Sequence, residues 1–124
     1  MTARMAPTQA KRVVSLAGLS GAMAVAEGAF GAHGVADASL RALLQTAAIY
    51  QLAAASAGLS LGLARRFFLA AALILVGGFI FAASLDAIVL TQEKRFGAIT
   101  PIGGLSLIAG FILVFLGALR SPED

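Results

Sequence analysis

The sequence predicts an all-α membrane protein, a four-span transmembrane helical bundle whose helices run up, down, up and down. Its 124 residues are 60% hydrophobic and only 12% charged, about half the charged fraction of a soluble domain. The charges cluster, so they leave apolar runs of about 17 to 25 residues, the length that crosses a hydrocarbon core. Basic residues stand in pairs at the ends of these runs, as expected of topology signals.

The first span is predicted at residues 13–32, after a short polar tail at residues 1–12. Small residues recur in this span at every fourth position, which lets another helix approach closely in lipid. They are Ser20, Ala24, Gly28 and Ala32. An alternative stays open, because Lys11 and Arg12 before an apolar stretch that ends Ala24-Val25-Ala26 are also typical of a cleaved signal peptide.

The second span is predicted at residues 43–63, and its helix is expected to begin earlier, in the interface. Asp37 is well placed to cap that helix, and Arg41, four residues on, is able to pair with Asp37. The span carries polar side chains in its first half, at Tyr50 and Gln51, and small residues in its second half. Gly58 and Gly62 form a four-residue pair that favours close helix packing.

The third and fourth spans are predicted at residues 67–90 and 100–119. The third is uncharged until Asp86. At the start of the fourth, Thr100 is predicted to be an N-cap, with a proline at the first helical position. Three glycines seven residues apart predict a seam against a neighbouring helix: Gly103, Gly110 and Gly117. Residues 120–124 are predicted to form a polar stub.

The distribution of basic residues predicts that both termini are cytoplasmic. With four spans, six basic residues fall on the side of the termini and three on the opposite side. The first set is Arg4, Lys11, Arg12, Arg65, Arg66 and Arg120, and the second set is Arg41, Lys94 and Arg95. The localisation that follows is a multi-pass position in a membrane.

This topology places a set of polar residues in the outer half of the membrane. They are Glu27, His33, Tyr50, Gln51, Asp86 and Thr100. Ionisable groups inside spans are costly, so each is a candidate for a functional site. The structural alternative is that Glu27 and Asp86, near helix ends, reach interfacial water or pair with basic residues of the outer loops. Whether the two carboxyl groups meet is not determined by the sequence.

The segment Glu27–Gly34 combines a carboxylate, three glycines and the single histidine of the chain. Gly28, Gly31 and Gly34 follow no predicted strand, so they are interpreted as sites of close backbone approach rather than as a phosphate loop. The chain has no cysteine and only one histidine, so no metal site is predicted. No cofactor is predicted either.

Several separate motifs together resemble a family of small inner-membrane proteins, the domain of unknown function 423. The motifs are GAFGAHG, the pair Tyr50-Gln51, Phe81 with Ser84-Leu85, and FGAITPIGG at residues 96–104, followed by the glycine-seamed helix. The resemblance covers roughly residues 13–120. It implies a four-span bacterial membrane protein and brings no established activity, cofactor or catalytic residue.

For function, the sequence favours a structural or accessory membrane protein that binds other membrane proteins, or itself, through its small-residue faces. The alternative is an oligomeric transporter or channel subunit for a small solute, cation or proton, which would use the polar residues of the outer half. An enzyme is not expected, because no nucleophile with a matching base is visible. The basic residues lie at span ends rather than in a stripe, so nucleic acid is not an expected partner. The expected partners are the bilayer, other copies of the chain or other membrane proteins.

Overall fold

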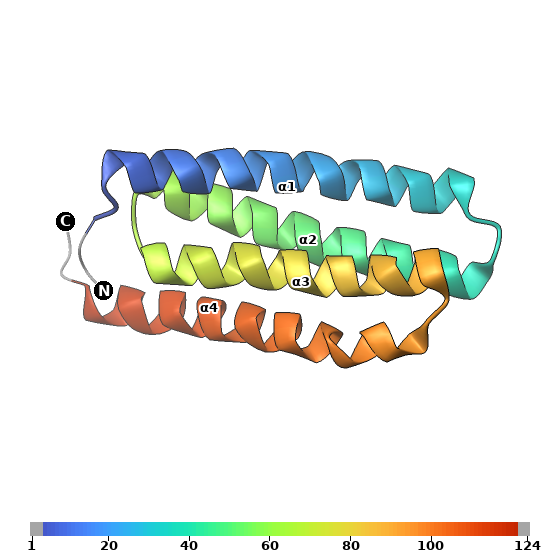
Figure 1. The fold of residues 1–124 in the computed structure, drawn as a ribbon. Coiled ribbons are helices and arrows are strands. Elements are labelled where there is room, and N and C mark those ends of the chain that lie inside the picture. The colour runs from blue at the N-terminus through green and yellow to red at the C-terminus, as the bar shows by residue number, and fades with distance from the viewer. Residues whose placement is uncertain (1–3, 122–124) are drawn as a thin grey trace.

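The computed structural model describes residues 4–121, so the predictions for residues 1–3 and 122–124 lie outside the described part (Figure 1). Four long helices and one short 3-10 helix make up the fold. They are α1 Pro7–Gly34, α2 Ala38–Ala64, α3 Phe68–Thr91, η1 Lys94–Ala98 and α4 Thr100–Arg120. Each of the four long helices is long and apolar enough to cross a membrane. The predicted four-helix, all-α membrane fold is confirmed.

Helix α1 begins before the apolar run, at Pro7, inside the residues predicted as a tail. Proline is favoured in the first helical turn, because its missing N–H has no helical partner there. The side chain of Gln9 folds back, and its Oε1 accepts a hydrogen bond of 2.8 Å from the backbone N–H of Ala6. Lys11 and Arg12 therefore lie on the helix rather than in an extended tail.

Helix α2 begins at Ala38, and Asp37 is its N-cap, as the sequence predicts. The Asp37 Oδ1 accepts hydrogen bonds from the Leu40 backbone N–H at 3.0 Å and from the Ser39 hydroxyl at 2.6 Å. The expected ion pair between Asp37 and Arg41 does not form. The Arg41 guanidinium instead donates to the carbonyl oxygens of Val35 and Ala36, at 3.0 and 3.1 Å, in the loop that follows α1. Those carbonyls lack helical partners, which is why a nearby arginine satisfies them.

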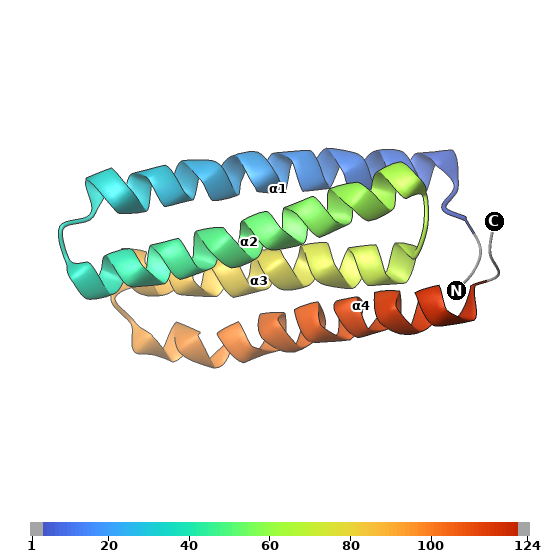
Figure 2. The same cartoon turned by 180° about the vertical axis from the view of Figure 1, so that it is seen from behind.

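The helices pack mainly in chain order, so α1 and α4 lie on opposite sides of the α2–α3 pair (Figures 1 and 2). Helix α1 packs along α2 and touches α3 only lightly, whereas α4 packs along α3. The core between them consists largely of small side chains, among them Ala47, Ala54, Ala71 and Ala82, with Ile74 fully buried. Small residues allow this close packing, which drives helix association in lipid.

Large apolar side chains cover the outside of the bundle. Leu63, Leu90 and Phe115 are 69%, 82% and 62% exposed, and many others on all four helices resemble them. A soluble monomer rarely shows so much continuous apolar surface. This surface fits hydrocarbon as the solvent.

Both described chain ends and the α2–α3 turn lie at one end of the bundle, while the α1–α2 and α3–α4 connections lie at the other end (Figure 1). The α2–α3 turn is made by Arg65 and Phe67, which both adopt left-handed backbone conformations with φ of 57°. With the charge distribution described above, the end that holds the termini is the cytoplasmic end. The opposite end is called the outer end below.

Candidate functional site

The two carboxyl groups inside the spans meet each other. Glu27 lies seven residues before the end of α1 and Asp86 five residues before the end of α3, so they are about 10 Å and about 8 Å from the outer end. The side chain of Glu27 is within hydrogen-bonding range of the Asp86 side chain. The Glu27 Oε1 and Asp86 Oδ1 atoms are buried, and neither has a hydrogen-bond partner among residues 4–121.

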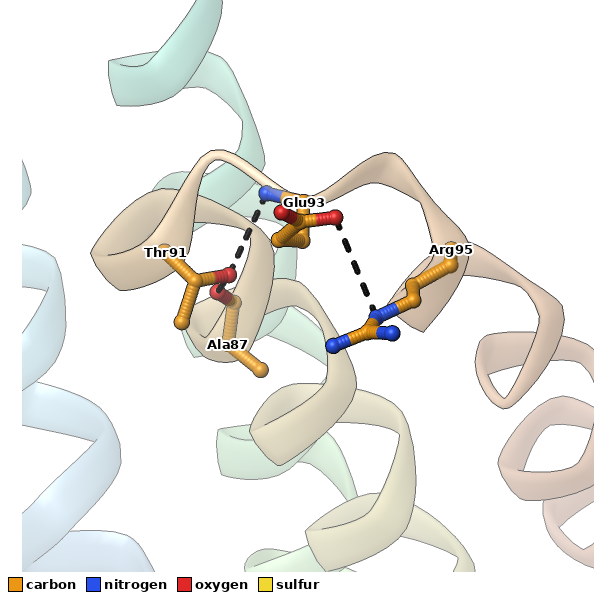
Figure 3. A network of polar contacts seen from close by, with 4 residues as sticks. All are labelled: Ala87, Thr91, Glu93 and Arg95. Atoms are coloured by element: carbon orange, nitrogen blue, oxygen red, sulfur yellow. Dashed lines mark hydrogen bonds and ion pairs between the residues drawn. The ribbon is translucent and has the colours of Figure 1, made fainter.

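No basic side chain within residues 4–121 forms an ion pair with either of these carboxyl groups. Two of the basic residues expected as partners, Arg41 and Arg95, are engaged elsewhere. Arg41 binds carbonyl oxygens of the α1–α2 loop, and Arg95 Nε lies 3.8 Å from Glu93 Oε2 in the α3–α4 loop, as Figure 3 shows. In that loop the Thr91 hydroxyl also links the Ala87 carbonyl to the Glu93 N–H. Two carboxylates this close in a low dielectric repel each other unless a proton or a cation lies between them.

Gln51 lies deeper, between α1 and α2. It is only 2% exposed, and its Nε2 donates to the Ser20 hydroxyl at 3.2 Å. The two side chains line the floor of a groove of about 310 Å³ between α1 and α3. The walls of this groove are apolar and are formed by Leu16, Leu19, Met23, Leu75, Val76 and Phe79.

Thr100 is not the N-cap of α4, contrary to the prediction. Ile99 occupies the cap position, and Thr100 begins the helix. Its hydroxyl instead lies 2.6 Å from the hydroxyl of Ser84 on α3, and Ser84 also donates to the Phe81 carbonyl. A cap would satisfy one backbone N–H locally, whereas this contact ties α4 to α3. In lipid a hydroxyl without a partner is costly, which favours the interhelical contact.

Tyr50 and His33 take no part in these contacts. Tyr50 is 48% exposed, and its ring packs on the Phe81 ring with centroids 4.6 Å apart. His33 is exposed in the last turn of α1. The predicted polar residues therefore do not all contact one another. Glu27 lies against Asp86, Gln51 binds Ser20 and Thr100 binds Ser84, while Tyr50 and His33 are exposed.

Three serine side chains that the sequence analysis did not assign to polar contacts also bind across helices. Ser20 and Ser84 were described above, and Ser106 of α4 donates to the Leu73 carbonyl of α3 at 2.8 Å. A serine among small residues is interpreted as a packing position. A polar residue at similar depth on the next helix could have indicated an interhelical hydrogen bond, as Thr100 does for Ser84.

The glycines of α1 and α2 face neighbouring helices, except Gly18 and Gly34. A Cβ on Gly28 would lie 3.5 Å from the Ala48 Cβ, and one on Gly31 would lie 3.1 Å from the Leu44 Cβ. Gly58 lies against the side chain of Leu75, and Gly62 lies against Val13 and Val14. Gly34, the last residue of α1, faces only the Phe30 ring of its own helix, so the predicted close approach of another backbone is not found there.

Helices α3 and α4 approach each other backbone to backbone. A Cβ on Gly103 would lie 2.5 Å from the Phe81 backbone nitrogen, and one on Gly110 would lie 3.0 Å from the Ala70 carbonyl oxygen. Gly77 of α3 lies opposite, against the backbone of Gly103 and Leu107. Gly117, the third glycine of the predicted seam, is buried. Backbones at this distance leave no space for side chains.

A second face of small residues on α1 is not covered by the bundle. Gly18, Ala22, Ala26 and Ala29 fall on one side of the helix, and all four are exposed. A Cβ on Gly18 would have no atom within 4 Å. The face with Ala24 and Gly28 is the one that packs on α2, so α1 carries small residues both toward and away from the bundle.

Comparison with known proteins identifies the same family that the sequence motifs resemble. The family described as "Protein of unknown function (DUF423)" matches residues 27–104. The chain is 34% identical over 114 residues to the "UPF0382 inner membrane protein YgdD" of Escherichia coli strain K12, which covers 84% of this chain and 86% of that protein. It is 36% identical over 119 residues to the "UPF0382 membrane protein SAB0533" of Staphylococcus aureus, covering 89% and 97%. No solved structure matches.

Proposed function

This chain belongs to the DUF423 family and is a multi-pass protein of the bacterial inner membrane, and from that premise we propose that it is an accessory protein that associates with other transmembrane helices through the outward face of α1. The observation that carries the proposal is the exposed row Gly18, Ala22, Ala26 and Ala29. In lipid, helices associate where small residues let their backbones approach.

The outward face of α4 provides the contrast. It carries bulky side chains, with Leu105, Ile108 and Phe115 between 57% and 66% exposed. Such side chains fill space among lipid tails and keep another backbone at a distance. Helix α1 also exposes the bulky Leu16, Leu19 and Val25, so its contrast with α4 is confined to the row Gly18, Ala22, Ala26 and Ala29, where small residues let a second backbone approach. A second copy of the chain or another membrane protein fits the α1 face.

The proposal is tested by the mass and protein content of the particle extracted gently from native membranes. Ala22→Ile is expected to remain in the membrane and to lose the associated mass, because the new side chain blocks close approach. Ala109→Ile on exposed α4 is the matched control and is expected to keep that mass. Single cysteines at positions 18, 22 and 26 should also cross-link across the interface, since the chain has no cysteine of its own. An Ala22→Ile particle of unchanged mass would overturn the proposal.

A second candidate function is supported by the unpartnered Glu27 and Asp86 oxygen atoms. Two facing carboxyl groups form a site for a proton or a small cation in a transporter or channel subunit. Four helices packed this closely enclose little space, so this function requires an oligomer. Glu27→Gln and Asp86→Asn in proteoliposomes should abolish a proton or cation flux that Glu93→Gln keeps. Loss of the first two variants from the membrane would instead assign the pair a structural role.

The proposal gives the chain no catalytic activity and no cofactor. Glu27 and Asp86 contact each other rather than a nucleophile, and His33 is exposed at a helix end. Turnover of a lipid or peptide by the purified protein, abolished by His33→Ala, would reverse this part of the proposal.

A further inference from the structure

A cavity of about 290 Å³ opens at the cytoplasmic end of the bundle, between the N-terminal segment, the start of α3 and α4. Its walls are mostly apolar, and its polar side chains are those of Arg4 and Gln9. The remaining walls are formed by Met5, Phe67, Phe68, Leu69, Ala70 and Leu113. The cavity lies at the opposite end of the bundle from Glu27 and Asp86.

The N-terminal wall of this cavity is fixed in place. The Met5 backbone N–H donates to the Arg65 carbonyl at 2.8 Å, and the Arg65 guanidinium donates to the Met5 carbonyl from Nε at 3.1 Å and from Nη2 at 2.8 Å. The Met5 side chain is 1% exposed and packs in a cluster with Ala10, Val13 and Ala71. These contacts hold the neighbouring Arg4 at the rim of the cavity.

The charges at this end of the bundle are of one sign among residues 4–121. The basic residues here are Arg4, Lys11, Arg12, Arg65, Arg66 and Arg120. The four described carboxylates, Glu27, Asp37, Asp86 and Glu93, lie toward the outer end. Cations close to the cytoplasmic surface attract anionic lipid.

A ligand of this cavity must match both an apolar interior and a cationic rim at the depth of the membrane interface. A free inorganic anion fits the rim but gains nothing from walls such as Phe67, Phe68 and Leu113. A phospholipid fits both, because its phosphate reaches the rim while its glycerol and upper acyl chain lie along the walls. The cation at the rim, Arg4, suits a phosphate because its planar guanidinium can donate two parallel hydrogen bonds.

We propose that this cavity binds one anionic phospholipid, with its phosphate at Arg4 and its acyl chain against Phe67, Phe68 and Leu113. This inference is independent of the proposed association through α1, which lies along another face of the bundle. One bound lipid would also connect the N-terminal segment to α4.

The test uses a tryptophan probe, since the chain has no tryptophan. Phe68→Trp places the probe in the cavity wall at a position that is 41% exposed. Vesicles of phosphatidylcholine and phosphatidylglycerol are prepared with bromine, which quenches tryptophan, on the acyl chains of one lipid at a time. Leu105→Trp, an exposed position near the outer end of α4, reports on bulk lipid as the matched probe.

The cavity probe is expected to prefer phosphatidylglycerol about fivefold over its share of the bilayer, the effect of one arginine near the surface. Arg4→Gln should remove that preference, while Lys11→Gln, exposed at the same end and outside the cavity, should keep it within about twofold. Because Arg4 is exposed, its variant should keep the helical content.

Three results would overturn the inference. Equal losses for Arg4→Gln and Lys11→Gln would show general attraction by surface charge rather than a site. Equal preferences at the Phe68 and Leu105 probes would show that the cavity is no different from bulk lipid. Quenching or enhancement of the Phe68→Trp emission by inorganic phosphate in lipid-free detergent would show a simple anion site in place of a lipid site.

Discussion

Replacing Gly103 by alanine tests whether close backbone contact holds α4 on α3. The new Cβ would lie 2.5 Å from the Phe81 nitrogen and 2.7 Å from the Gly77 carbonyl oxygen, whereas ordinary contacts begin at 3.4 Å. Both neighbours are backbone atoms, so no side chain can rotate away. The helices must separate locally by roughly 0.9 Å, the difference between 3.4 and 2.5 Å, and such overpacking costs about 1–3 kcal/mol.

Two further effects enter the expected change. Alanine is about 0.5–1 kcal/mol better than glycine in a helix interior, which offsets part of the cost. Separation of the helices also stretches the Ser84–Thr100 contact of 2.6 Å and the Ser106–Leu73 bond of 2.8 Å, which lie in the same interface. Interhelical bonds of this kind contribute about 0.6 kcal/mol each. The net destabilisation expected for Gly103→Ala is about 1–2 kcal/mol.

The assay is reversible unfolding in mixed micelles with increasing sodium dodecyl sulfate, followed by far-ultraviolet circular dichroism. The matched control is Gly104→Ala, because a Cβ at this adjacent position has no neighbour closer than the Phe81 ring at 4.0 Å. That variant should unfold at the same or a higher detergent fraction, through the gain of about 0.5–1 kcal/mol in helix propensity. If Gly103→Ala is as stable as Gly104→Ala, the argument from backbone contact is refuted.

The same assay checks two more expectations, and chemical labelling checks a third. Gln51→Leu should leave the Ser20 hydroxyl without its partner and lower stability by about 0.6–1.7 kcal/mol, an expectation contradicted by an unchanged midpoint. Hydrogen bonds from the Ser39 hydroxyl and the Leu40 N–H lower the pKa of Asp37 below its ordinary 3.8, so the cap stabilises the protein above that pH and loses its effect as the pH falls further. The stability difference between wild type and Asp37→Ala should therefore be constant near neutral pH and shrink below about pH 3.8, whereas a constant difference at all pH values would argue against the cap. Glu93→Cys should react with a membrane-impermeant reagent from the outer side only, and cytoplasmic labelling would reverse the assigned orientation.

The number and limits of the helices follow from local features of the chain. Asp37 caps α2 through its own side chain and the backbone three residues on, so the pattern could be read without any tertiary contact. The role of a side chain at a helix start was less predictable where a neighbouring helix offers it a partner. Thr100 looked like a cap and instead binds Ser84, because the α3–α4 contact gives its hydroxyl a partner that the local sequence does not contain.

The polar residues show the limit of the sequence in a different way. Their depth could be predicted from their distance to the span ends, so Glu27, Gln51 and Asp86 were all placed in the outer half. Their contact partners could not be predicted, because these depend on the rotation of each helix about its axis. Glu27 faces Asp86 across α1 and α3, Gln51 faces Ser20, and Tyr50 packs on Phe81, so residues of similar depth belong to different interfaces.

The sequence alone predicts four membrane-spanning helices. It also predicts which helix ends share one side of the membrane and where two helix backbones can approach each other. These properties depend on hydropathy, on charge and on the positions of glycine, proline and capping residues along the chain. The tertiary structure was needed to show that α1 and α4 lie on opposite sides of the α2–α3 pair and that the Glu27 and Asp86 side chains meet. It was also needed to show that no helix of the bundle covers the small-residue row of α1 that begins at Gly18. The physical reason is that in lipid both the buried and the outer face of a helix can be apolar. On α3, with apolar residues around its whole circumference, hydropathy has no period that could tell which side faces a neighbour.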